Sequence, residues 1–348
     1  MDDLTDDLTM LRYLGRELEH EPPATLVRQR ARLAENAATR PRWGVRKWML
    51  VGVAALITAA VALTPTLLIG DRAGRPVAAP PDPRPAKLTE ALSVLLVGTD
   101  SEMGTPRYRL PGARSDTMLL LHLPADGKRP TVVSIPRDSM VRLPACAIPK
   151  GADPSLPNMI NSAFHNGGLS CAWRTVESLT RIRIDHAVQV EFTGFAEIID
   201  ALGGIEVTIP APIDDRQAKL TLSKGRQLLD GKAALGYARL RRFGDGSDLA
   251  RIGRQQQVMR AMLKKVRATT PAELLGLLDT LKQSVTTDSG LDTRTLAAIA
   301  GTLAGTDPGS IRFVTVPTMP HPGDPNRLAW REKAAEQLFA AIREHQAE

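Results

Sequence analysis

The chain has 348 residues, enough for one or two domains with a large core, and carries a formal net charge of +7 and a pI near 9.6. This basic balance is compatible with nucleic acid, an anionic membrane surface or a phosphate substrate. Aromatic residues make up only 4%, which argues against a single-strand nucleic-acid binder that stacks bases on aromatic rings. The two cysteines and six histidines form no group with zinc-ligand spacing, which excludes a zinc site of that kind.

The N-terminal part of the chain reads as a membrane anchor behind a polar tail. Residues 1–47 are polar and charged, whereas residues 48–70 contain no charged residue and are long enough to cross a bilayer as a helix. Because a long polar segment precedes the apolar run, we expect an uncleaved anchor rather than a signal peptide. Basic residues just before the run favour a cytoplasmic N-terminus, and basic residues after it weaken that bias. The sequence therefore predicts a single-pass plasma-membrane protein. Its residues before the anchor are cytoplasmic, and its residues after the anchor are extracytoplasmic.

Residues 71–87 are rich in proline, alanine and arginine, and we interpret them as a semi-extended spacer. From residue 88 to residue 348 the pattern becomes that of an α/β domain. Short apolar runs typical of strands occupy residues 93–97, 117–123, 131–135, 187–191, 205–209 and 311–316. Amphipathic stretches typical of helices occupy residues 158–165, 172–180, 193–202, 230–237, 248–267, 271–281, 293–303 and 331–345. Because several strands are continuously apolar, we expect a three-layer α/β/α fold with a central mixed sheet covered on both faces.

Cys146 and Cys171 flank a polar loop and a predicted helix. A disulfide between them would contribute roughly 3 kcal/mol in the chain-entropy model and would persist only in an oxidising compartment. That agrees with an outward-facing domain, and two separate free thiols are the alternative.

Residues 237–257 hold five arginines, two aspartates and three glutamines, with Gly244 and Gly246 in the middle. If residues 238–242 are extended, Arg239 and Arg241 point to the same side. Two guanidinium groups would then converge on one anion, an arrangement that suits bidentate phosphate recognition.

A helix follows these glycines, with Ser247 or Asp248 as its N-cap. At 100° per residue, Asp248, Arg251 and Gln255 lie on the apolar stripe of this helix and should point inward, whereas Arg254 lies on the far side and is predicted to be at the surface. The alternative is an ordinary solvated charged face. Buried arginines require anions to offset their desolvation, either Asp248 or a ligand.

The first part of the domain supplies further charged residues at strand ends. Asp100 follows the first strand, Asp116 opens the second, and Arg137 follows the third. Antiparallel pairing of the second and third strands through a hairpin near residues 126–127 should make Asp116 and Arg137 neighbours. Each piece alone is ordinary turn chemistry. Together the carboxylates and arginines predict a site where Mg²⁺ is held by carboxylates and a pyrophosphate by arginines.

Six ordered sequence pieces resemble one known family. They are Val97-Gly98-Thr99-Asp100, Arg114-Ser115-Asp116-Thr117-Met118, Ser134-Ile135-Pro136-Arg137-Asp138, Ile160-Asn161-Ser162-Ala163-Phe164, Asp200-Ala201-Leu202-Gly203-Gly204-Ile205 and the stretch 237–257. In order and spacing they are similar to the LytR-CpsA-Psr family of bacterial cell-envelope proteins, which have one membrane anchor and an extracytoplasmic α/β/α domain. The resemblance covers residues 88–267, and the C-terminal elements are expected to complete the same domain.

The resemblance implies an enzyme that transfers a glycopolymer, as its phosphate, from an undecaprenyl pyrophosphate carrier to peptidoglycan. It implies that Asp100 and Asp116 hold Mg²⁺, with Mn²⁺ as a substitute, and that Asp248 orients arginines or acts as the base, with Asp138 as the other candidate base. The implied pyrophosphate-binding residues are Arg114, Arg137, Arg239, Arg241, Arg251 and Gln255. The family often has a second basic residue where this chain has Ala113, so one phosphate contact is missing or supplied elsewhere. The prenyl tail would need an apolar tunnel between sheet and helices.

Three other functions are compatible with parts of this sequence. Water in place of the acceptor would make the same site a polyprenyl pyrophosphate phosphatase. A nucleic-acid-binding regulator would need a cytoplasmic domain with a basic helix exposed to a groove, which conflicts with the predicted outward orientation, so no nucleic-acid partner is expected. A non-catalytic module that binds an anionic wall polymer would gain nothing from two aspartates among the arginines, whereas a metal site needs them.

Overall fold

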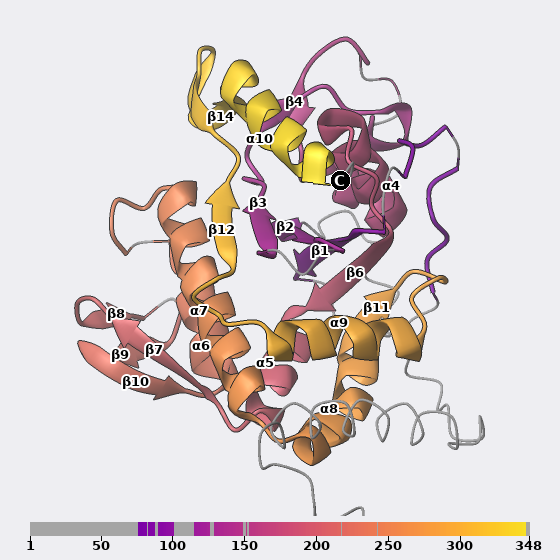
Figure 1. The fold of residues 1–348 in the computed structure, drawn as a ribbon. Helices are drawn as coiled ribbons and strands as arrows, with labels where there is room; N and C mark the ends of the chain where they lie inside the picture. The colour runs from indigo at the N-terminus through magenta and orange to yellow at the C-terminus, as the bar shows by residue number, and fades with distance from the viewer. Residues whose placement is uncertain are drawn as a thin grey trace, which may run out of the picture. The chain divides into compact units, whose positions relative to one another are not determined.

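The continuous apolar runs form a six-stranded sheet in the order β11-β6-β1-β2-β3-β12 (Figure 1). The computed structural model describes residues 76–81, 83–87, 90–100, 115–125, 129–148, 151, 153–216, 218–241 and 243–345. The strands are β11 (Val285–Thr287), β6 (His186–Glu191), β1 (Leu92–Thr99), β2 (Ser115–Leu123), β3 (Thr131–Ser134) and β12 (Arg312–Thr315). β1 is parallel to β6 and β3 to β12, whereas the other three pairings are antiparallel. The predicted mixed sheet and the predicted β2–β3 hairpin are confirmed.

The predicted tail (1–47) and anchor (48–70) lie outside the described residues, and so does Arg114. All described residues belong to one compact unit. Within the part of the chain that the structure describes, no helix is long and apolar enough to cross a membrane.

Helices cover both faces of the sheet because alternate strand residues are apolar on both sides. On one face, Leu95 and Leu120 pack with α4 (Ser162–Thr180) and α10 (Glu332–His345). On the other, Val94 and Leu119 pack with four helices. These are α5 (Phe192–Ala201), α7 (Asp248–Ala268), α8 (Pro271–Ser284) and α9 (Thr293–Gly305). The α/β/α layering predicted from the sequence is therefore present.

A third apolar cluster lies beside this sandwich. It is formed around Tyr237 by α6 (Gly231–Arg239) and two hairpins. The hairpins pair β7 (Ile205–Ile209) with β10 (Gly225–Leu229), and β8 (Ile213–Asp215) with β9 (Leu220–Leu222). Because α6 packs on this cluster and on α5 and α7, its C-terminal end is fixed relative to the sheet.

The two helices predicted at 158–165 and 172–180 are a single kinked helix, α4. Its first residue is Ser162, and residues 158–159 instead form β5 (Asn158–Met159), which pairs with β4 (Met140–Val141). The kink is at Gly168, whose φ of 65° is open to glycine but disfavoured for other residues. Cys171 of α4 forms a disulfide with Cys146 in η2 (Ala145–Ala147), with a Cα–Cα distance of 5.8 Å. The predicted disulfide is confirmed.

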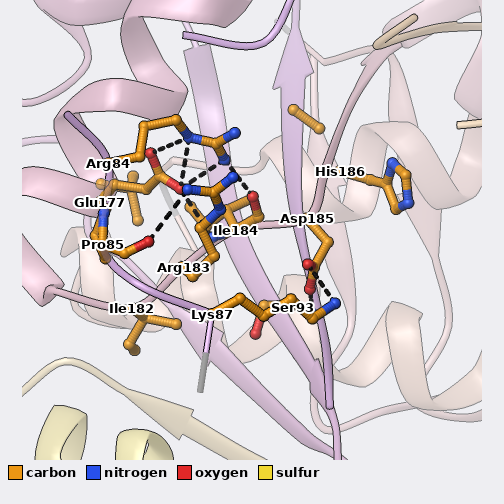
Figure 2. A network of polar contacts seen from close by, with 12 residues as sticks. Arg84, Pro85, Lys87, Ser93, Glu177, Ile182, Arg183, Ile184, Asp185 and His186 are labelled. Atoms are coloured by element: carbon orange, nitrogen blue, oxygen red, sulfur yellow. Dashed lines mark hydrogen bonds and ion pairs between the residues drawn. The ribbon is translucent and has the colours of Figure 1, made fainter. Parts of the chain in front are cut away.

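The described part of the predicted spacer lies against the domain. Val77 forms a bridge with Asp288, and its N–H donates to the Thr287 carbonyl at 3.0 Å. Figure 2 shows Arg84 reaching Glu177 of α4, with its Nη2 2.7 Å from Oε1 and its Nε 2.9 Å from Oε2. The spacer is thus docked at both ends of its described length, although the boundary proposed at residue 87 stays a prediction.

Candidate functional site

The candidate site lies at the sheet edge where β1, β3, β6 and β12 end and β2 begins. β1 and β2 pair Gly98 with Thr117 and Thr99 with Ser115, with a register shift between the two pairs that leaves Asp116 as the extra residue. Asp100 follows directly after Thr99, so the backbone places the two predicted metal ligands next to each other. This is the geometry that a β-bulge produces, and bulges often redirect a side chain beside an active site.

The turn at residues 136–139 brings the first arginine to this edge. The Ile135 N–H donates to the Met118 carbonyl at 2.9 Å, so the chain stays beside β2 past the end of β3. Arg137 Nη1 then donates to Asp116 Oδ1, and its Nε lies 3.6 Å from Asp138 Oδ2. The predicted pairing of Asp116 with Arg137 is confirmed. Both side chains are only 12–13% exposed, so the pair is shielded from screening by solvent.

The N-terminus of α7 supplies the second arginine. Ser247 caps the helix by accepting from the Ala250 N–H, which confirms one of the two predicted caps. Arg251 donates to Asp248, and the two side chains are 8% and 9% exposed. The inward orientation predicted for these residues is confirmed, and Gln255 one turn later is half-buried.

One hydrogen-bonding residue holds α7 over this edge. The Gln256 side-chain amide donates to Ser134 Oγ at 3.0 Å and to Thr315 Oγ1 at 3.2 Å, the last residues of β3 and β12. The sequence did not single out Gln256, because its partners lie 122 and 59 positions away. This contact fixes where Arg251 enters the site.

Electrostatics links these residues into one cluster. The pKa of Arg251 is lowered to about 10, mainly by burial and also by the positive charges of Arg137 and Arg241, while Asp116 and Asp138 act in the opposite direction. A buried cation is costly unless anions compensate it. At neutral pH Arg251 therefore stays charged in a site where a further anion would stabilise it.

Three buried polar atoms in the cluster have no hydrogen-bond partner among the described residues. They are Arg137 Nε, Arg251 Nε and Asp248 Oδ2. Buried donors and acceptors in folded proteins are nearly always satisfied, and exceptions commonly mark a site for a ligand, ion or water. The cluster thus offers two free N–H donors and one free carboxylate oxygen at the same edge of the sheet.

Arg239 and Arg241 do not lie on an extended segment, so that prediction is wrong. α6 continues through Arg239 because the apolar side of its last turn, with Tyr237 and Ala238, is buried in the third cluster. The helix ends with Leu240 as its C-cap, and Arg241 lies in a bend after it. The exposed Arg239 guanidinium stacks 4.1 Å from the ring centroid of Phe192, which follows the end of β6, so this arginine still reaches the same edge.

Arg254 is buried at 6% exposure, which overturns its predicted surface position. The chain after α6 folds back across α7, using positive φ at Gly244 and Gly246. Arg254 donates to the carbonyl of Phe243 at 3.0 Å and to that of Leu240. Its role is therefore to hold the loop that carries Arg241, and the two glycines were the available sequence signal for such a fold-back.

The acidic residues fit a metal that is shared with a substrate rather than caged by the protein. Over the described ranges, no group of three or more His, Cys, Asp or Glu side chains could hold a metal ion. Mg²⁺ commonly uses one or two carboxylates together with substrate phosphate oxygens and water. Asp100 and Asp116, with arginines beside them, match that donor set.

The chain is similar to proteins of one known family. The LytR_cpsA_psr family model matches residues 73–343. The probable cell wall biosynthesis protein LcpB of Corynebacterium glutamicum is 35% identical over 272 residues, which cover 73% of this chain and 62% of LcpB. TagV of Bacillus subtilis, named polyisoprenyl-teichoic acid–peptidoglycan teichoic acid transferase, is 33% identical over 175 residues, 48% of this chain and 43% of TagV.

Among solved structures, the LytR-Csp2A-Psr enzyme from Actinomyces oris matches with a TM-score of 0.61 and 26% identity, over 78% of this chain and 95% of that one. The aligned part of the chain spans 62% of LcpB and 43% of TagV, less than two thirds of either relative. The family model, in contrast, covers most of the chain. The chain therefore belongs to the LytR_cpsA_psr family.

Proposed function

We propose that the chain is a membrane-anchored phosphotransferase that moves a glycopolymer, as its phosphate, from an undecaprenyl pyrophosphate carrier to peptidoglycan. The observation that carries the proposal is the pair of arginines Arg137 and Arg251, whose buried Nε atoms have no hydrogen-bond partner in the described chain. Guanidinium groups suit phosphate oxygens because their donors match them bidentately. The name of TagV, a teichoic acid transferase acting on a polyisoprenyl-linked polymer, supports the same reaction class.

The charge of the site supports Mg²⁺ as a partner of the substrate. Asp116 pairs with Arg137, and Asp100 and Asp138 add further carboxylates at the same edge of the sheet. A pyrophosphate diester brings about two more negative charges, and a cation bound beside these carboxylates would offset their repulsion of the phosphate groups. Asp100 and Asp116 are the residues that would hold Mg²⁺, and the ion would supply charge neutralisation at the phosphate oxygens.

The residues of the chain divide the work of the reaction. Arg137 and Arg251 bind the phosphate oxygens with their free donors and stabilise the negative charge that develops during transfer. Arg239 and Arg241, which are exposed, add positive charge at the solvent side of the site. An acceptor hydroxyl oxygen forms the new bond to the sugar-linked phosphorus, the bond from that phosphorus to the bridging oxygen breaks, and prenyl phosphate leaves.

We propose Asp248 as the general base that accepts the proton of the attacking hydroxyl. Its Oδ1 pairs with Arg251, which leaves Oδ2 as a buried acceptor without a partner among the described residues. Asp138, the other candidate base, is engaged by Arg137 on one oxygen and by Arg327 on the other. A base must reach the proton that it accepts, so the carboxylate with the open oxygen is the better candidate.

The prenyl tail would lie on the face of the sheet that α5, α7, α8 and α9 cover. This face has many apolar side chains that are only partly buried: Leu92, Leu96, Val190, Met259, Met262, Val266, Leu281, Leu291, Leu303 and Phe313. Methionine side chains adapt readily to an irregular apolar ligand. The adjoining edge of this face is the one that carries the charged cluster, so head group and tail have neighbouring binding surfaces.

The test uses the full chain in nanodiscs with Mg²⁺, a polyprenyl pyrophosphate-linked oligosaccharide and peptidoglycan fragments, and it measures prenyl phosphate and the transferred sugar by mass spectrometry. We expect both products, and we expect Asp116→Asn to abolish both while Arg226→Ala, in an exposed ion pair of the β7–β10 hairpin, leaves them unchanged. Prenyl phosphate with free sugar phosphate would instead identify a phosphatase. Binding of the donor without either product would identify a non-catalytic polymer-binding module.

A further inference from the structure

A C-terminal hairpin lies beside the 136–139 turn of the site. It consists of β13 (Thr318–His321) and β14 (Asp324–Trp330). Leu328 forms a bridge with Ser139, and its N–H donates to the Asp138 carbonyl at 3.1 Å. The Trp330 indole N–H donates to Ser139 Oγ at 3.0 Å. These backbone and indole contacts hold the hairpin against the turn, and none of them involves a charged side chain.

Arg327 connects this hairpin to the charged cluster. Its Nη1 lies 3.4 Å from Asp138 Oδ1, and its side chain is 35% exposed. The other oxygen of Asp138 lies 3.6 Å from Arg137 Nε, beyond good hydrogen-bond length. Asp138 thus sits between two guanidinium groups, and one of them has a buried donor that no described residue satisfies.

We propose that Arg327 is a positioning residue for donor binding, an inference that rests on the proposed function. By attracting Asp138, Arg327 prevents this carboxylate from closing on Arg137, which already pairs with Asp116. The Nε donor of Arg137 stays available to a phosphate oxygen. Without Arg327, Asp138 has Arg137 as its remaining ionic partner among those identified, and it competes with the substrate for that donor.

The alternative is that Arg327 only stabilises the hairpin, and the structure separates the two roles. The contacts of Leu328 and Trp330 do not involve the Arg327 side chain. Arg327 is 35% exposed, and its ionic partners Asp138 and Asp324 lie at 3.4 and 3.6 Å, so it should contribute little to stability. Replacing it should therefore change donor affinity more than the free energy of unfolding.

The test measures the Kd of the full chain for a polyprenyl pyrophosphate donor with Mg²⁺, together with the melting temperature. We expect Arg327→Ala to raise the Kd about fivefold with an unchanged melting temperature, the ratio typical of losing one partly exposed ionic contact. Arg327→Lys should restore affinity to within about twofold, because it returns the charge. Arg226→Ala, from an exposed pair far along the chain, serves as the matched control.

A second background identifies the route of the effect. If Arg327 acts through Asp138, adding Arg327→Ala to the Asp138→Asn variant should not raise the Kd further, because the competing carboxylate charge is already gone. A loss that persists in that background would overturn the positioning role in favour of direct substrate contact. A Kd for Arg327→Ala equal to that of the parent would overturn the proposal while leaving the proposed function intact.

The inference also has a readout that does not depend on donor binding. In crystal structures of the two proteins, the separation of Arg137 Nε and Asp138 Oδ2 should shorten from 3.6 Å to hydrogen-bond length in Arg327→Ala. An unchanged separation would overturn the inference. If the parent binds no donor while the separation shortens, the proposed function fails and the positioning of Asp138 by Arg327 stands.

Discussion

Two regions of the molecule bury arginines, and they do so in opposite ways. Near α4, Arg84 donates to both oxygens of Glu177 and to the Ile184 carbonyl (Figure 2). Its guanidinium also stacks over the Trp173 ring. At the sheet edge, Arg251 pairs with Asp248 through one nitrogen and leaves its Nε without a partner in the described chain. The protein supplies hydrogen-bond acceptors for Arg84, which holds the segment around residue 84 against α4. Arg251 keeps an N–H donor that a ligand could use.

The comparison implies that Arg84→Ala mainly affects stability, and this is the largest effect we expect. The Glu177 side chain is 3% exposed, so removing Arg84 leaves a buried carboxylate without its ionic partner. Breaking a buried pair in this way costs about 3–5 kcal/mol. Denaturant unfolding should show this loss in the free energy of unfolding, while turnover per folded molecule stays at the parent level. A large fall in turnover with unchanged stability would contradict a purely structural role for Arg84.

Arg251→Lys should show the opposite behaviour. Lysine keeps the charge but lacks the planar set of donors, and losing one stabilising donor at a developing charge typically lowers turnover about 100-fold. The melting temperature should change little, since Asp248 keeps a cation nearby. The control is Arg260→Lys on the exposed side of the same helix, where the guanidinium lies over the Phe313 ring. Equal loss of activity in both variants would show that the effect is not specific to the site.

Lys87→Ala removes an exposed ion pair near Arg84 and has the smallest expected effect. Lys87 pairs with Asp185 at 2.7 Å, but its side chain is 44% exposed. Exposed pairs contribute about 0.5 kcal/mol, and that contribution falls with added salt. Asp185 also accepts from the Ser93 N–H, so it keeps a partner. The free energy of unfolding should therefore fall less in Lys87→Ala than in Arg84→Ala, and denaturant unfolding at low and high salt measures both losses.

The sequence predicted the parts of the site that depend on local geometry. Antiparallel pairing of β2 and β3 brings the start of β2 beside the end of β3, and the pairing of Asp116 with Arg137 followed from that. The inward position of Arg251 followed from helical spacing in the same way. Both predictions needed only elements that are continuous in the chain.

Contacts between distant segments could not be predicted in this way. Arg254 was assigned to the surface because helical periodicity does not reveal that a neighbouring loop covers the far side of α7. Arg84 lies in a segment whose composition is typical of a spacer, and its partner Glu177 is 93 positions away. Arg327 meets Asp138 across 189 positions. In each case the tertiary contact, and not the local pattern, decides the role of the arginine.

The docked segment also sets a length scale for the whole protein. For an anchor at the predicted residues 48–70, the six residues 71–76 separate it from Val77, which contacts Asp288. Six residues of fully extended chain reach at most about 22 Å, less than the thickness of a bilayer. With this anchor, the proposed transfer would take place close to the membrane surface, so the tether length would limit which acceptor strands the domain can reach.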